Sequence, residues 1–587
     1  MHGGRRNVFN VDQFNNLILS LSFRDAVAEG QFPPRVSPSL SRGLGNPYHQ
    51  FYPPFSHAVP AALGILAGNV LTGYALAAVL FTALGFVGAW RLYRLLTLSG
   101  VAACLGAFLF TLSPYLLLDR VSRTAWAEFA AFNLSPLALY LLLRWSCAGG
   151  IGRFLASSAA LAALFATHLL TSFFLALFLA VFGALWALNL LSARGKGRRC
   201  WPRKLEGRAA RALAAGAFAA LMAAAYLGPA ALYGDLIMKE LMLPRNGFES
   251  TAVPVLALLS PSDERMIMTQ GILSLRIQLG APLLLSFLAC AWSALRARPP
   301  LRRPPHLAPL IVTALLALAL VTAPGPMASL FPPVQAAQAS FRYVMIFVLA
   351  ASLMGAMTLG ALFQGGAAQA AARKGAALAL ALSAAVLAGP YLHQQELTPG
   401  YPFPVTETLL RDLGVLTYGN DAYFRTPPGP ESGEWAPPGL EPVPGRGGAA
   451  RRLFTADLSR VHRLPDGGVP LDVLYYPGLQ EIKVSVDGSG ALFRPETVWQ
   501  MREGLGFLAG SSFGALDGPG PGALHGLVLT GLPDRGLLEA EVRFTGMGWA
   551  NRVSAAALSV FALLCLAALF GKTGPLRARG PYGLTGT

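Results

Sequence analysis

The sequence has few charged residues for its length. Only 13% of its 587 residues are charged and 54% are hydrophobic, whereas about a quarter of the residues in soluble globular proteins are charged. This deficit excludes an ordinary soluble globular protein and indicates that lipid is the solvent around much of the chain.

Cysteine and histidine are also scarce. The five cysteines are Cys104, Cys147, Cys200, Cys290 and Cys565, so none lies between residues 392 and 551. No two are close enough in sequence to form a metal knuckle, and the eight histidines are scattered. These absences exclude a zinc-knuckle protein and predict that segment 392–551 folds without disulfides.

What the sequence does contain is apolar runs of membrane-spanning length. Leu307–Ala323, Phe341–Phe363 and Val553–Phe570 carry almost no charge, and each is long enough to cross about 30 Å of hydrocarbon as a helix. Tract 154–191 is too long for one crossing and predicts a tight hairpin. We therefore expect an α-helical polytopic membrane protein with about eleven transmembrane helices, at 72–92, 100–118, 125–145, 154–171, 172–191, 212–233, 272–292, 307–323, 341–363, 375–391 and 552–570.

The distribution of cations predicts the orientation of these helices. Alternate loops hold 21 lysines and arginines on one side of the predicted stack and five on the other. Cytoplasmic loops carry the excess of positive charge, so the C-terminal tail, 572–587, is predicted to be cytoplasmic, in a bacterial plasma (inner) membrane. The net charge of +17 is explained in this way, and no basic stretch is interleaved with aromatic residues as nucleic-acid binding would require.

The same assignment places two segments outside the cytoplasm. Residues 1–71 form a first loop with a short interfacial helix at 15–28, and 392–551 precede the last helix, 552–571. The first 55 residues are polar and follow neither a signal peptide nor a span. Either the following hydrophobic hairpin carries them across, or the gene begins upstream with one more helix; the second hypothesis is the favoured one.

The outer segment 392–551 has two parts. A Pro/Gly-rich tract, Thr426–Gly448, is typical of an irregular linker. Alternating apolar and polar residues then predict strands, separated by Pro-Gly and Asp-Gly turns, at Leu471–Tyr476, Glu481–Val486, Gly526–Leu529 and Leu538–Phe544. A small extracytoplasmic β-rich domain is the expectation.

Ionisable residues gather at the predicted outer ends of the helices. They can reach one outer-leaflet cavity and are Asp12, Asp119, Arg123, Glu128, His168, Arg276 and Arg342. Such residues are costly near lipid and usually face a cavity or a partner. Five of them also have a simpler interpretation: Arg342 as an interfacial anchor, His168 as a packed polar residue, Asp119 with Arg123 as an ion pair at a helix end, and Asp12 as a loop carboxylate.

Several motifs carry a resemblance to a known family. They are Asp12 with Gly30–Arg35, Gly43–Pro47 and Phe51–Pro54; Tyr115, Asp119, Arg123 and Glu128-Phe129, with Pro136 after them; Ser340–Arg342; and Tyr475–Gly478 with Val486–Gly488. Together these resemble bacterial membrane proteins labelled "6-pyruvoyl-tetrahydropterin synthase-related", which are similar in turn to YfhO-like proteins and to the GT-C glycosyltransferase superfamily. The scattered histidines offer no support for the pterin chemistry in that label.

The resemblance implies a GT-C-like enzyme that moves a sugar from a polyprenyl-phosphate donor to an extracytoplasmic glycan, lipid or protein acceptor. It implies that Asp12, the acidic residue of the first outer loop, is a general base or a metal ligand. The predicted catalytic residues are Asp12, Asp119 and Glu128, and the predicted substrate-binding residues are Arg35, Tyr52, Arg123, His168, Arg276 and Arg342. The resemblance also allows a divalent metal ion as cofactor, but Asp12–Asn16 lacks the histidine of the family's stretch, which argues against metal binding here.

Physical chemistry agrees with this expectation. A phosphate leaving group needs fixed guanidinium groups, and an acceptor hydroxyl needs a carboxylate within hydrogen-bond reach. The main alternative is a transporter or lipid flippase, which predicts paired repeats with broken helices and polar residues near the midplane. A structural or assembly protein working through its β-rich domain is a third reading.

Overall fold

The computed structural model describes most of the apolar helices and several strands of segment 392–551. The described residues are 11–37, 48–97, 99–192, 202–232, 248–259, 277–296, 307–363, 406–407, 441–442, 451–459, 469–475, 480–487, 489–493, 525–529, 534–544 and 548–570. The predicted span 375–391, Arg276 and most of the Pro/Gly-rich tract lie outside them.

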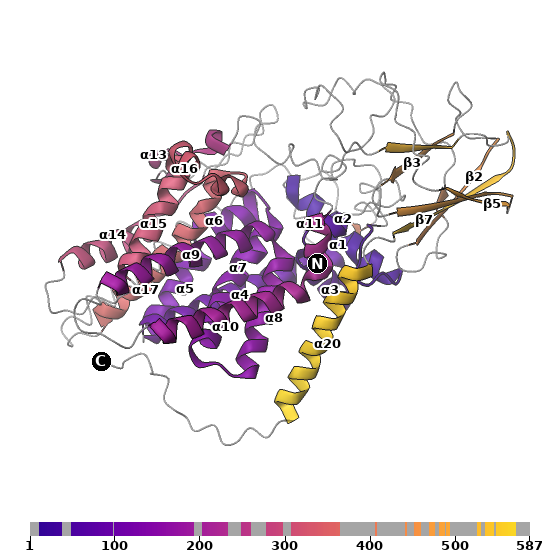
Figure 1. The fold of residues 1–587 in the computed structure, drawn as a ribbon. Coiled ribbons are helices and arrows are strands. Elements are labelled where there is room, and N and C mark those ends of the chain that lie inside the picture. Colours follow the sequence, from indigo (N-terminus) through magenta and orange to yellow (C-terminus); the bar gives the residue numbers. More distant parts are fainter. Residues whose placement is uncertain are drawn as a thin grey trace, which may run out of the picture.

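Helices dominate the described part of the chain (Figure 1). The helices before residue 150 are α1 (Val11–Ala28), α2 (Tyr48–Phe51), α3 (Phe55–Ala67), α4 (Val70–Thr97), α5 (Gly100–Thr111), α6 (Pro114–Leu117) and α7 (Trp126–Ala148). Those that follow are α8 (Ile151–Thr167), α9 (Leu169–Ser192), α10 (Pro202–Met222), α11 (Ala224–Leu232), α13 (Val255–Leu259), α14 (Ala281–Arg296), α15 (Leu307–Thr322), α16 (Pro324–Leu330), α17 (Val344–Phe363) and α20 (Gly548–Phe570). Short 3₁₀ turns lie at Phe248–Thr251, Pro332–Ala337 and Ser340–Tyr343.

The helices have the lengths and composition of a polytopic membrane protein. Among the described residues five are long and apolar enough to cross a bilayer, at Val70–Thr97, Trp126–Ala148, Leu169–Leu188, Ser340–Ala361 and Trp549–Ala568. Three further pairs of helices are long and apolar enough only when the two helices are taken together. Each pair is bent at the break between its helices, by 44° in α5–α6, 80° in α10–α11 and 113° in α15–α16. Two of these second helices begin with proline, which has no N–H to continue the preceding helix. The architecture is therefore helical and polytopic, with five to eight candidate spans among the described residues, whereas the sequence predicted about eleven over the whole chain.

Some boundaries differ from the predicted ones. The tract 154–191 divides at His168 into α8 and α9, three residues before the expected break. The predicted span 272–292 becomes the shorter α14. In the first 71 residues, α1 extends the predicted interfacial helix, and α3 is a 13-residue apolar helix with Pro60 inside it, which is too short to span about 30 Å of hydrocarbon.

Small residues let the central helices approach closely. A Cβ added to Gly88 of α4 would lie 2.5 Å from the backbone nitrogen of Leu137 in α7, and one added to Gly73 would lie 2.3 Å from the backbone of Gly64 in α3. Close backbone contact through glycine is a usual way to pack helices in lipid, where apolar side chains gain little by leaving the solvent.

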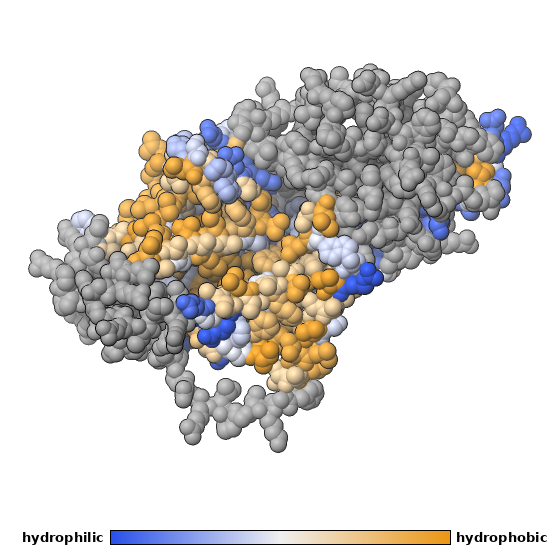
Figure 2. Space-filling model, in the orientation of Figure 1, coloured by the Kyte–Doolittle hydropathy of each residue, from blue (hydrophilic) through white to orange (hydrophobic). Residues whose placement is uncertain are grey.

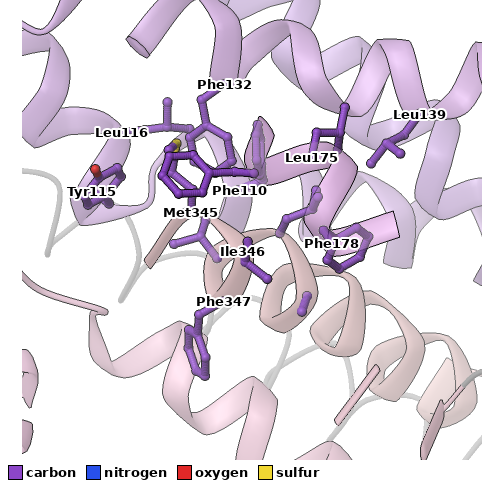
Figure 3. Close-up of a cluster of buried hydrophobic side chains, with 14 of the residues drawn as sticks. Phe110, Tyr115, Leu116, Phe132, Leu139, Leu175, Phe178, Met345, Ile346 and Phe347 are labelled. Carbon is purple, nitrogen blue, oxygen red and sulfur yellow. The ribbon is translucent and has the colours of Figure 1, made fainter. Parts of the chain in front are cut away.

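Apolar side chains also cover the outside of the bundle. Figure 2 shows them gathered over the helices on the visible face, with hydrophilic residues at the margins. The helices α7 and α17 are instead internal, because 78% of the most apolar window of each is buried. Their packing produces an aromatic and aliphatic core that includes Phe110, Tyr115, Phe132 and Phe347 (Figure 3).

The described strands lie beyond the end of the bundle where α1 and α2 are found (Figure 1). An antiparallel sheet has the order β1-β2-β7-β4-β5 and is built from β1 (Glu441–Pro442), β2 (Arg451–Asp457), β4 (Gln480–Val486), β5 (Ser489–Phe493) and β7 (Leu537–Phe544). A second, two-stranded sheet pairs β3 (Val469–Tyr475) with β6 (His525–Leu529). Between β4 and β5, Asp487 adopts a φ of 48°, which matches the Asp-Gly turn at this point of the sequence.

Candidate active site

An irregular stretch of backbone separates α6 from α7. Residues Leu118–Ser122 form one turn of π-helix, closed by the Arg123 N–H, which donates to the Leu118 carbonyl at 2.8 Å. Thr124 follows with a φ of 52°, a conformation that β-branched residues rarely adopt. Single π turns and left-handed residues of this kind are frequent at functional sites.

Glu128, in the first turn of α7, accepts two hydrogen bonds and forms an ion pair with a second guanidinium, although it is only 2% exposed. The Tyr115 hydroxyl donates to its Oε1 at 2.6 Å. Arg123 Nη1 lies 3.0 Å and Arg342 Nε 3.3 Å from its Oε2. Both oxygens are therefore engaged, and this carboxylate holds two guanidinium groups in place.

Asp119, in the π turn, is bonded on one side only. Its Oδ1 accepts from Arg123 Nη1 at 3.0 Å, and its Oδ2 is buried with no hydrogen-bond partner among the described residues. A buried, unsatisfied carboxylate oxygen is costly unless a ligand, water or proton completes it. Asp119 thus offers the free oxygen of the site, while Glu128 does not.

Arg123 forms ion pairs with both carboxylates through one of its nitrogens. Both of its ion pairs use Nη1, so the other N–H groups of its guanidinium form no hydrogen bond or ion pair with the described residues. Its guanidinium lies 5.2 Å from the centre of the Phe341 ring. Burial alone would lower the pKa of Arg123, but the carboxylates of Glu128 and Asp119 raise it above its ordinary value.

Arg342 reaches the same place from the 3₁₀ turn before α17. Its Nη1 donates to the Ala337 carbonyl at 3.0 Å and to Gln338 Oε1 at 2.7 Å. Gln338 has a φ of 65° and is the second non-glycine residue in a left-handed conformation beside the site. Arg123 and Arg342 remain 12% and 14% exposed, whereas Asp119 is 0% exposed.

His168 sits at the break between α8 and α9. The Thr171 N–H donates to its Nδ1 at 3.2 Å, and the Thr171 hydroxyl lies 2.8 Å from the same atom. Nδ1 is therefore the acceptor and the proton of the neutral ring is on Nε2. The charges of Glu128, Arg342 and Arg123 all act on this ring, so His168 borders the site.

Helix α1 also contacts the loop of the candidate site. The Asn16 side-chain amide donates to the Thr124 carbonyl at 3.1 Å and is 6% exposed. Asp12 belongs to the same helix, four residues earlier, and the structure does not describe its side chain. Sequence reasoning did not select Asn16 or Gln338, because neither differs from an ordinary polar residue until the fold brings it here.

Two predicted binding residues lie elsewhere. Arg35 donates to the Ala225 carbonyl of α11 at 2.6 Å and contacts Asn551 of α20, and burial lowers the pKa of its guanidinium to about 10. Tyr52 stacks on Tyr48 with ring centres 4.9 Å apart. The structure thus brings together Asp119, Arg123, Glu128, His168 and Arg342, and gives Arg35 and Tyr52 other neighbours. Arg276 is outside the described residues.

The candidate site has no set of side chains suited to hold a metal ion among the described residues. Within the described residues no group of three or more His, Cys, Asp or Glu side chains could hold a metal ion. The two carboxylates that meet here already face two guanidinium groups.

Comparison with known proteins gives no further identification. No protein-family model matches the chain, and no curated protein matches it. The functional conclusion therefore depends on the site itself and on the motif resemblance.

Proposed function

We propose that this protein is a membrane-embedded GT-C-like glycosyltransferase that moves a sugar from a polyprenyl-phosphate donor to an extracytoplasmic acceptor. The main support for the proposal is that Asp119 has an unsatisfied Oδ2 and lies close to the guanidinium groups of Arg123 and Arg342. One candidate base and two fixed cations at the ends of apolar helices are what transfer from a lipid phosphate needs.

Each residue has a defined part in the proposed reaction. Asp119 accepts the proton of the acceptor hydroxyl while that oxygen forms a bond to the anomeric carbon of the sugar. The bond from this carbon to the donor phosphate oxygen breaks, and the phosphate leaves with the electron pair. Arg123 and Arg342 stabilise its negative charge through N–H donors. Glu128 is a positioning residue, because it holds both guanidinium groups and has no free oxygen.

An apolar groove beside the site supports a lipid donor. It lies between α7, α9 and α17 and has a cavity volume of about 20 Å³, or about 260 Å³ when the space open to the surroundings is counted. Its walls are Phe132, Ser135, Thr171, Phe174, Leu175, Phe178, Met345, Ile346 and Leu349, several of which are seen in Figure 3. Thr171 contacts both this groove and His168, so a prenyl chain in the groove would have its phosphate end toward the charged residues.

Transfer of labelled sugar from polyprenyl phosphate tests the proposal. The assay uses membranes of a strain lacking the gene, complemented with wild type, Asp119→Asn or Glu29→Gln, an exposed carboxylate in the first outer segment. We expect Asp119→Asn to lose about 100-fold or more of the activity and Glu29→Gln to keep it. Absence of glycosylated product with wild type, together with altered lipid movement, would favour the flippase instead.

A further inference from the structure

A second group of buried polar side chains lies between α1, α2 and α3, outside the site described above. His49, Gln50 and His57 are 1%, 0% and 0% exposed. Five of their atoms have no hydrogen-bond partner among the described residues: both ring nitrogens of His49, both amide atoms of Gln50 and Nε2 of His57. Buried polar groups in folded proteins are almost always paired, so a cluster of this size requires a missing partner.

The group is uncharged and surrounded by aromatic rings. Burial lowers the pKa of His49 to about 3, so its imidazole is neutral at physiological pH. The two imidazole centres are 6.4 Å apart. Phe23 lies edge-on to His49 at 5.1 Å, and Tyr52 lies 5.4 Å from His57.

The unpartnered atoms are donors and acceptors in nearly equal number. A neutral imidazole has one of each, and a carboxamide has both. A cation would satisfy only the acceptors and an anion only the donors. A metal ion would also lack a counter-charge, because no described carboxylate forms an ion pair with either histidine. A hydroxyl group donates and accepts at once, and it is the group that matches this set.

The cluster adjoins the candidate active site along one helix. Ser20 lies one turn after Asn16 in α1; its hydroxyl is 3.3 Å from His57 Nδ1, whereas Asn16 donates to Thr124 in the active-site loop. From the other direction, Trp126 Nε1 donates to the carbonyl of Ser56, the neighbour of His57, at 2.7 Å. Trp126 is two residues before Glu128, so the two polar groups share their supporting elements.

We propose that His49, Gln50 and His57 bind the hydroxyl groups of a neutral sugar, with Tyr52 and Phe23 as the apolar walls of this sugar site. The inference rests on the proposed function, since it gives the transferred or accepting sugar a place on the α1 side of the candidate active site. Neutral amide and imidazole groups beside aromatic rings satisfy both the polar edge and the apolar face of a sugar ring.

Ligand-observed NMR on the purified full-length protein in nanodiscs tests the sugar site. The probes are methyl glucoside, methyl galactoside and methyl mannoside, with their fully O-methylated forms as controls that retain the ring but cannot donate hydrogen bonds. We expect at least one glycoside to bind and its O-methylated form to bind at least about 10-fold more weakly. His49→Leu should weaken binding by at least about 10-fold, and should raise the melting temperature without ligand because it removes unsatisfied buried atoms. Gln50→Leu provides the same test if His49→Leu does not fold.

The outcomes separate this inference from the proposed function, because binding needs no turnover. Asp119→Asn should bind the glycoside as wild type does. A wild-type protein that transfers sugar yet binds none of the three glycosides would overturn the sugar site alone. Stabilisation by Zn²⁺ or Mn²⁺ that is lost in His57→Leu would show a metal site in its place. Glycoside binding without any sugar transfer would keep the sugar site and refute the transferase.

Discussion

Arg123 Nη1 lies 3.0 Å from Asp119 Oδ1, and the second oxygen of that carboxylate is buried without a hydrogen-bond partner in the described part of the chain. Glu128, on the other side of the same guanidinium, has both oxygens occupied. The two neighbouring carboxylates therefore differ: Asp119 has one unsatisfied buried oxygen, whereas both oxygens of Glu128 are bonded.

Glu128→Gln should destabilise the protein more than Asp119→Asn. Removing the Glu128 charge leaves two partly buried guanidinium groups without their shared partner, a type of change that costs about 3–5 kcal/mol. Tyr115→Phe should cost about 1.5–3 kcal/mol, the usual value for a hydrogen bond to a charged group. Heat-induced loss of the monodisperse peak of a fluorescent fusion measures this order. An Asp119→Asn protein less stable than Glu128→Gln would reverse the assigned roles.

Arg342→Lys should weaken donor binding more than it slows the chemical step. Lysine keeps the charge but cannot contact Ala337, Gln338 and Glu128 together, as the guanidinium fork does. Loss of about 1.5–3 kcal/mol corresponds to a KM for the donor raised by about 10- to 150-fold. Initial rates against donor concentration measure it. Arg120→Lys, an exposed position one residue after Asp119, is the control and should leave KM unchanged.

Leu175→Trp should reduce transfer from long-chain donors and spare short-chain ones. Leu175 lines the apolar groove and is 7% exposed, so the larger indole fills space that a prenyl chain would occupy. Leu188→Trp, on the same helix but 62% exposed, is the matched control. Equal loss with donors of all chain lengths would mean that the groove does not hold the chain.

Gly88→Ala should lower stability by about 1–3 kcal/mol, the cost of overpacking a tight contact. The added Cβ would meet the Leu137 backbone at 2.5 Å, and backbone cannot move aside as a flexible side chain can. Gly183→Ala in α9 has no atom within 4 Å and should gain up to about 1 kcal/mol from helix propensity. Thermal unfolding of both variants in detergent checks the difference.

Reporter fusions test the orientation that the cation distribution predicts. Fusions at Gly195 and Gly366 should report the cytoplasm, and a fusion at Gly467 should report the outside. These sites lie in two cation-bearing loops and in the segment before the last helix. A cytoplasmic signal at Gly467 would refute the arrangement.

The sequence by itself determined the class of protein and the local features of the site. Long uncharged runs can only be helices in lipid, because every backbone N–H and C=O must be satisfied within the segment. Alternation placed four strands within one or two residues of β3, β4, β6 and β7. Tyr115, Asp119 and Arg123 recur every four residues, so their proximity was readable from helical spacing.

Only the tertiary structure decided which of the selected residues meet. Arg342 joins Glu128 from more than two hundred residues away, and Asn16 reaches Thr124 across 108 positions. Arg35 and Tyr52 belong to the same sequence motifs but contact other elements. The π turn, the left-handed Thr124 and the free oxygen of Asp119 depend on packing between distant helices, which imposes conformations that local sequence preference would not select.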